Sequence, residues 1–69
     1  MNMTIKAEQM ISYLQAKLTK FQVEVEKYGM EDRVVEELFD EMIACKEMVE
    51  CLIQMPVNLQ MDGKVTVGF

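Results

Sequence analysis

Apolar residues recur at alternating steps of four and three positions through the first part of the chain, from about residue 5 to residue 28. This stretch contains neither Gly nor Pro, and Gly29 follows its last apolar position. The spacing is that of a heptad repeat, which predicts a helix with one narrow apolar stripe. The residues of the stripe are Ala7, Ile11, Leu14, Leu18, Phe21, Val25 and Tyr28.

A second heptad pattern runs from about residue 31 to residue 54 and ends before Pro56, which disfavours continuation of a helix. Its repeat positions are Val35, Leu38, Met42, Cys45, Val49 and Leu52, flanked on one side by Phe39, Ile43 and Ile53 and on the other by Val34 and Met48. The apolar arc therefore covers about 220° of the helical wheel, far more than one neighbouring helix can bury.

The short turn around Gly29 predicts that the two helices fold back on each other as an antiparallel hairpin. Because the second helix carries more apolar surface than this hairpin can cover, we expect a homodimer or a higher symmetric oligomer in the form of a helical bundle. The expected contact between subunits consists of Val35, Leu38, Phe39, Met42, Ile43, Val49 and Ile53.

After Pro56 the pattern changes to alternation, which predicts a β-hairpin over about residues 57–69. A two-residue turn at Asp62-Gly63 would place the apolar residues of the two strands on opposite faces, whereas a three-residue loop, 61–63, places them on one face. We therefore expect the three-residue loop, with Gly63 in a left-handed conformation. The expected pairs are Leu59 with Val65 and Val57 with Val67. This hairpin can pack on its own helices or pair with strands of another subunit.

Together these elements predict one α+β domain, mainly α, over residues 1–69: an antiparallel helical hairpin followed by a short C-terminal β-hairpin. The chain has no His and a formal charge of −5. Without His it lacks the commonest general base and metal ligand, so we expect no enzyme, no cofactor and no metal site. The acidic charge argues against direct nucleic-acid binding, and no apolar run approaches the about 20 residues of a membrane span.

Acidic residues line the outer face of the second predicted helix: Glu36, Glu37, Asp40, Glu47 and Glu50. The simpler interpretation is a solvated face that keeps the protein soluble. The functional interpretation is a docking strip for a basic protein. Met48 and Met55 lie one heptad apart at the edge of the apolar arc, near the predicted hairpin, and are candidates for an adaptable partner contact, an oligomer seam or the lining of a ligand crevice.

The two cysteines, Cys45 and Cys51, lie six residues apart on the same predicted helix. At this spacing their side chains point to different faces, so we expect two free thiols, one in the core and one near the surface. Reduced thiols and the absence of an apolar signal sequence near residue 1 lead us to expect a cytoplasmic protein.

The sequence thus favours a small, acidic, Met-rich protein that associates with itself and binds another macromolecule, as an adaptor or an inhibitor of the kind found among phage accessory proteins. The alternative is an oligomeric protein that binds or sequesters a small molecule in pockets between subunits. A third interpretation is a purely structural subunit whose only task is assembly.

Overall fold

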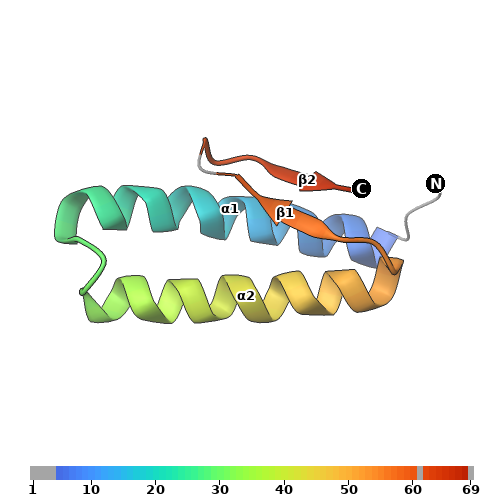
Figure 1. Ribbon diagram of the computed structural model, residues 1–69, viewed down its shortest axis with the longest axis horizontal. Helices are drawn as coiled ribbons and strands as arrows, with labels where there is room; N and C mark the ends of the chain where they lie inside the picture. The colour runs from blue at the N-terminus through green and yellow to red at the C-terminus, as the bar shows by residue number, and fades with distance from the viewer. Residues whose placement is uncertain (1–4, 61, 69) are drawn as a thin grey trace.

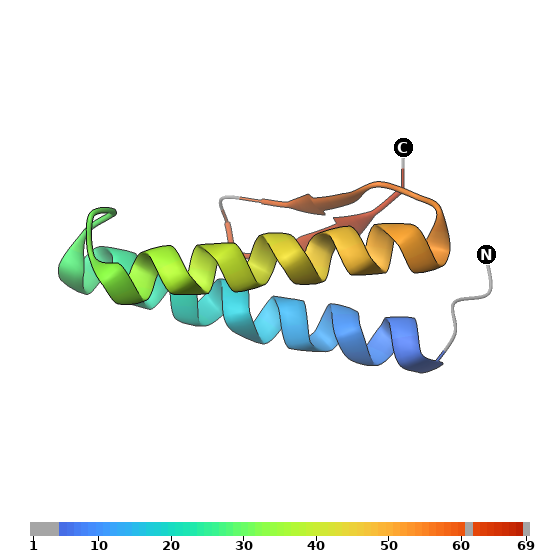
Figure 2. The ribbon, with the colours of Figure 1, turned by 90° about the horizontal axis from the view of Figure 1, so that it is seen from below.

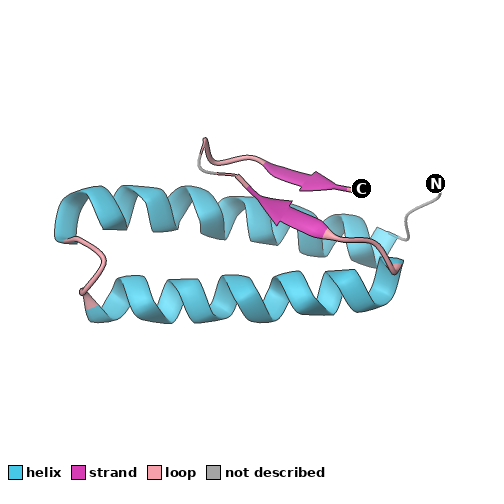
Figure 3. Ribbon diagram, in the orientation of Figure 1, coloured by secondary structure: helices cyan, strands magenta, loops and turns pink. Residues whose placement is uncertain are grey.

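The computed structural model describes residues 5–60 and 62–68. In chain order the elements are α1 (Ile5–Tyr28), α2 (Arg33–Ile53), β1 (Val57–Leu59) and β2 (Val65–Val67). The two helices lie antiparallel, and the two strands form a hairpin on one side of them (Figures 1 and 3). The predicted α+β fold, mainly α with a C-terminal β-hairpin, is confirmed.

The core lies along the seam between α1 and α2, as the heptad spacing predicted. Ala7, Leu14 and Leu18 of α1 are buried, and they face five buried residues of α2: Val35, Leu38, Met42, Cys45 and Val49. The seam includes the first predicted position of each helix, Ala7 and Val35, but the last predicted position of each, Tyr28 on α1 and Leu52 on α2, is exposed.

Polar contacts define the ends of α2. Asp32 caps its start, because its carboxylate accepts hydrogen bonds from the backbone N–H groups of Val34, at 2.9 Å, and Val35, at 3.4 Å. At the other end Gln54 adopts a left-handed conformation, with φ of 55°, and its N–H donates to the carbonyl of Glu50. The helix thus ends at Ile53, three residues before Pro56, in agreement with the sequence pattern.

The β-hairpin has the predicted register. Val57 pairs with Val67 and Leu59 with Val65, so all four apolar side chains lie on the face that packs against the helices. Gly63 has a φ of 90° and donates its N–H to the carbonyl of Gln60. The predicted loop and strand also include Met61 and Phe69, which lie outside the described residues.

The hairpin packs on its own helices rather than standing apart from them. It covers one face of the helix pair, over the N-terminal half of α1 and the C-terminal half of α2, and it stops well short of the α1–α2 turn (Figures 1 and 2). Glu50 anchors its start, because the carboxylate accepts a hydrogen bond from the N–H of Val57 at 2.9 Å. The described residues therefore leave two surfaces of the helix pair uncovered: the face opposite the hairpin, and the part of the near face beside the turn.

Candidate interaction surfaces

The first uncovered surface is the back face, which consists of Met10, Tyr13, Ala44, Met48 and Leu52. Tyr13 lies two residues from Gln15, and Met48 lies two residues from Glu50. Two positions along an α-helix correspond to a rotation of about 200° around its axis. Since Gln15 and Glu50 both bind the β-hairpin, Tyr13 and Met48 lie on the opposite side of the helix pair. Tyr13 is 51% exposed and Met48 57% exposed.

Two adjoining hollows, of about 530 Å³ each, run along the back face. Charged residues of both signs border them: Lys6 on α1, and Glu41 and Glu47 on α2. The back face therefore has an apolar centre and a rim that carries both positive and negative side chains. Its floor contains Ala44, whose small side chain permits another helix to approach closely.

An ion pair holds Tyr13 in place at the edge of the back face. Lys17 Nζ lies 2.7 Å from Glu41 Oε2 and 5.3 Å from the centre of the Tyr13 ring. The hydrogen bond to Glu41 raises the pKa of Lys17 above its ordinary value, while partial desolvation opposes this effect. The pair is exposed to solvent, so it orients these side chains more than it stabilises the fold.

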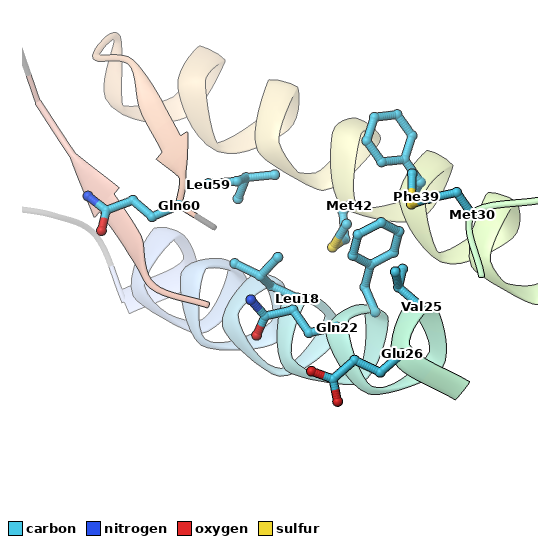
Figure 4. A pocket seen from close by; sticks show the side chains of 10 residues that line it. Leu18, Gln22, Val25, Glu26, Met30, Phe39, Met42, Leu59 and Gln60 are labelled. Atoms are coloured by element: carbon cyan, nitrogen blue, oxygen red, sulfur yellow. The ribbon is translucent and has the colours of Figure 1, made fainter. Parts of the chain in front are cut away.

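The second uncovered surface is the front groove, a hollow of about 560 Å³ beside the α1–α2 turn. Its apolar lining comes from α1, α2 and the turn: Leu18, Phe21, Val25, Met30, Phe39 and Met42. Figure 4 shows Val25 and Leu18 of α1 across the groove from Phe39 and Met42 of α2, with Leu59 at the end nearest the hairpin. The rings of Phe21 and Phe39 lie 6.0 Å apart at an interplanar angle of 44°, a tilted contact typical of aromatic pairs.

Acidic residues border the front groove. Glu26 lies at its edge, and a smaller hollow next to it is bordered by Glu36 and Asp40. No basic residue of the described part of the chain lines either hollow. The front groove thus differs from the back face, whose rim carries both signs of charge.

The predicted partner-binding carboxylates do not all have the same surroundings. Glu36, Glu37, Asp40 and Glu47 are exposed, and Glu37 Oε1 lies 3.7 Å from the Nε of Arg33, which is also exposed. Glu50, in contrast, is half-buried and binds within the chain, to the N–H of Val57 and to Lys46 Nζ at 3.1 Å. These two contacts, the backbone hydrogen bond first, lower the pKa of Glu50 below its ordinary value. Glu50 therefore holds the fold together and offers little to a partner.

The residues predicted to form the subunit contact differ in how far they are buried within the single chain. Val35, Leu38, Met42 and Val49 are buried within the single chain, because α1 covers the centre of the α2 arc. Ile43 and Ile53 are half-buried, and only Phe39 is exposed. Of the two methionines named as partner contacts, Met48 is exposed on the back face and Met55 is half-buried. The apolar surface left for a partner thus lies on the flanks of the predicted contact.

Sequence reasoning missed the role of Gln15, which lies beside the α1 seam. Its Oε1 accepts a hydrogen bond from the N–H of Val65, and its Nε2 donates to the carbonyl of Gly63. Gln22, one heptad further along α1, lies under Gly63. Two glutamines one heptad apart beside an apolar seam are the signal that could have identified this contact.

The cysteines have the predicted arrangement. Both are free, Cys45 in the core and Cys51 exposed. Burial raises the pKa of the Cys45 thiol, and its Sγ lies 3.6 Å from the carbonyl oxygen of Met10. Cys51 lines one hollow of the back face, so its accessibility reports on anything that covers that face.

Within residues 5–60 and 62–68, no group of three or more His, Cys, Asp or Glu side chains is arranged to hold a metal ion. Neither α1 nor α2 combines the length and apolar content that crossing a membrane requires. Comparison with protein-family models, with curated proteins and with solved structures gave no match. We therefore take the function from the geometry of this chain alone.

Proposed function

We propose that this chain is a small non-enzymatic interaction protein that associates with copies of itself through the back face and binds a basic macromolecule through its acidic surface. The observation that supports self-association most strongly is the exposure of Tyr13, Met48 and Leu52 together on one face of the helix pair. Contiguous apolar patches of this kind on a soluble protein commonly mark an interface.

The charges around the back face favour a second copy as its occupant. In a two-fold dimer the same surface meets itself, so a self-complementary surface must carry both signs of charge. Lys6 lies on α1, and Glu41 and Glu47 lie on α2. Packing α1 of one copy against α2 of the other brings Lys6 toward Glu47 of the partner copy and forms a four-helix bundle.

The acidic surface of α2 supports the second part of the proposal. Glu36 and Asp40 are exposed on α2, line neither hollow of the back face, and remain available in such a dimer. A basic protein is the partner that this charge attracts, and the chain then acts as an adaptor or as an inhibitor that covers its target's basic surface, with the general profile of a small phage accessory protein. The two free thiols fit a reducing cytoplasm.

A second candidate function is the binding of a small molecule. The front groove, of about 560 Å³, is within the size range of ligand sites, which extends from about 300 to 1,000 Å³. A rise in the melting temperature with a small apolar ligand, in the absence of any protein partner, would favour this function over the first.

Light scattering across a dilution series tests self-association, with Met48→Glu as the variant and Val23→Glu as its matched control. Both residues are about half exposed on a helix, but Val23 lines none of the hollows described above. We expect a multiple of the 8.0 kDa chain mass for the wild type and for Val23→Glu, and a single-chain mass for Met48→Glu. A wild-type mass of 8.0 kDa at every concentration would contradict the proposal.

A further inference from the structure

We propose that the front groove is a docking site for a short basic helix of a partner protein, which inserts apolar side chains between α1 and α2. This inference rests on the partner-binding part of the proposed function. It specifies where the partner binds and which side chains of the partner make the contact. It does not depend on self-association, because the front groove and the back face lie on opposite sides of the helix pair.

The length of the front groove suits two turns of a helix. The groove extends along α1 from Leu18 to Val25, a separation of seven positions that corresponds to about 10 Å. Leu59, the last residue of β1, closes one end of the groove, and Met30 lies at the other. An amphipathic helix presents side chains at positions i, i+3 or i+4, and i+7 over this distance, so two or three of them fit.

The side chains of the groove are those that commonly bind apolar anchors. Phe39 is 45% exposed although its ring contacts Phe21, and Met30 is 61% exposed. Aromatic residues and methionine are enriched in the centres of protein interfaces, and methionine adapts its shape to the side chain it meets. The groove therefore offers an apolar floor that residues 5–60 and 62–68 leave uncovered.

The charges around the groove determine which partner fits. Glu26, Glu36 and Asp40 surround the apolar floor of the groove and its adjoining hollow. A second copy of this chain, with its formal charge of −5, would meet like charge there, and so would a nucleic acid. A helix with Lys or Arg on both sides of its apolar stripe instead gains favourable contacts along both edges.

A designed peptide is the probe that tests this docking site. We would use a fluorescent helix of about 14 residues with Leu at i, i+3, i+4 and i+7 and Lys at most other positions. A second peptide of the same composition, with its Leu residues spread around the helix, separates groove binding from attraction by charge alone. Fluorescence anisotropy gives the two dissociation constants at low and high salt.

The α1–α2 turn offers a matched pair of variants, Met30→Lys and Tyr28→Lys. The two residues flank Gly29, are 61% and 60% exposed and gain the same charge, but only Met30 lines the groove. We expect Met30→Lys to weaken binding of the amphipathic peptide by about tenfold or more, and Tyr28→Lys by no more than about twofold. Circular dichroism checks that both variants keep their helices.

Three results would overturn the docking site. The first is the absence of binding of the amphipathic peptide to the wild type, and the second is equal binding of the two peptides. The third is a light-scattering result in which Met30→Lys has the mass of a single chain while Met48→Glu keeps the mass of the oligomer. That result would show that the front groove binds a second copy of this chain. Failure of the peptide test leaves the light-scattering result unaffected, so the docking site and self-association are tested separately.

Discussion

Gln15 in α1 and Val65 in β2 lie fifty residues apart in the sequence and are joined by a hydrogen bond of 3.0 Å from the Val65 N–H to the Gln15 Oε1. The same carboxamide donates to the carbonyl of Gly63, so one side chain binds both the loop and the second strand of the hairpin. This contact determines where the hairpin lies along α1. It therefore also fixes the closed end of the front groove.

Replacement of Gln15 with Ala should loosen the hairpin from the helices. The substitution removes two hydrogen bonds and leaves the partly buried N–H of Val65 without this acceptor, at a cost of about 1–3 kcal/mol in the free energy of unfolding. Urea titration measures the loss. Gln9→Ala, on an exposed position of the same helix, is the control and should change stability by less than about 0.5 kcal/mol. Equal stability of the two variants would show that the Gln15 contacts contribute nothing.

The two glycines at turns allow backbone strain to be separated from crowding. Gly29 and Gly63 have φ values of 85° and 90°, and an Ala at either position should cost about 1–2 kcal/mol from the left-handed conformation alone. A Cβ at Gly29 would meet nothing, whereas one at Gly63 would lie 2.5 Å from Gln22 Oε1. We expect Gly63→Ala to be at least as destabilising as Gly29→Ala in thermal unfolding. A smaller effect at Gly63 would contradict the loop geometry.

The attachment of the hairpin to α2 should depend on pH through Glu50. Its carboxylate has a folded-state pKa below its ordinary value of 4.5, mainly because it accepts the hydrogen bond from Val57. The stabilisation is therefore present above pH 4.5 and is lost as the pH falls through the lower folded-state value. The NMR shift of the Val57 amide should titrate below pH 4.5 in the wild type and lose this titration in Glu50→Gln. A wild-type midpoint above 4.5 would refute the assignment.

The two thiols should react at different rates with an alkylating reagent. Cys51 is exposed, whereas Cys45 is buried and its raised pKa lowers the fraction of reactive thiolate. We expect one fast and one slow thiol per chain, with the fast phase absent from Cys51→Ser and present in Cys45→Ser. Because Cys51 lines the back face, its reaction should also slow as the protein concentration rises. A fast phase that persists in Cys51→Ser would contradict this assignment.

Apolar spacing was sufficient to predict most of the fold. Leu14 and Val49 are buried where the heptads placed them, and the pairing of Val57 with Val67 follows from the need to keep apolar strand residues on one face. The pattern did not predict the exposure of Tyr28 and Leu52, because a heptad repeat does not show how far neighbouring side chains cover each position of the seam.

The candidate surfaces were less predictable than the fold. Met48 was identified at the edge of the α2 arc and lies on the back face, but the front groove depends on how much of the helices the hairpin covers. Each strand has only three residues, and this length limits the cover to the end away from the turn. Long-range polar contacts such as that of Gln15 produce no periodic pattern. Apolar spacing therefore could not predict how much of α1 and α2 the β-hairpin covers.

Self-association through the back face is tested most directly by isotope-filtered NMR on a mixture of labelled and unlabelled chains. The proposal predicts intermolecular NOEs from the methyl group of Met48 in one copy to Met10 or Tyr13 in another. The absence of any intermolecular NOE from the back face, in a sample whose mass is that of one 8.0 kDa chain, would contradict it.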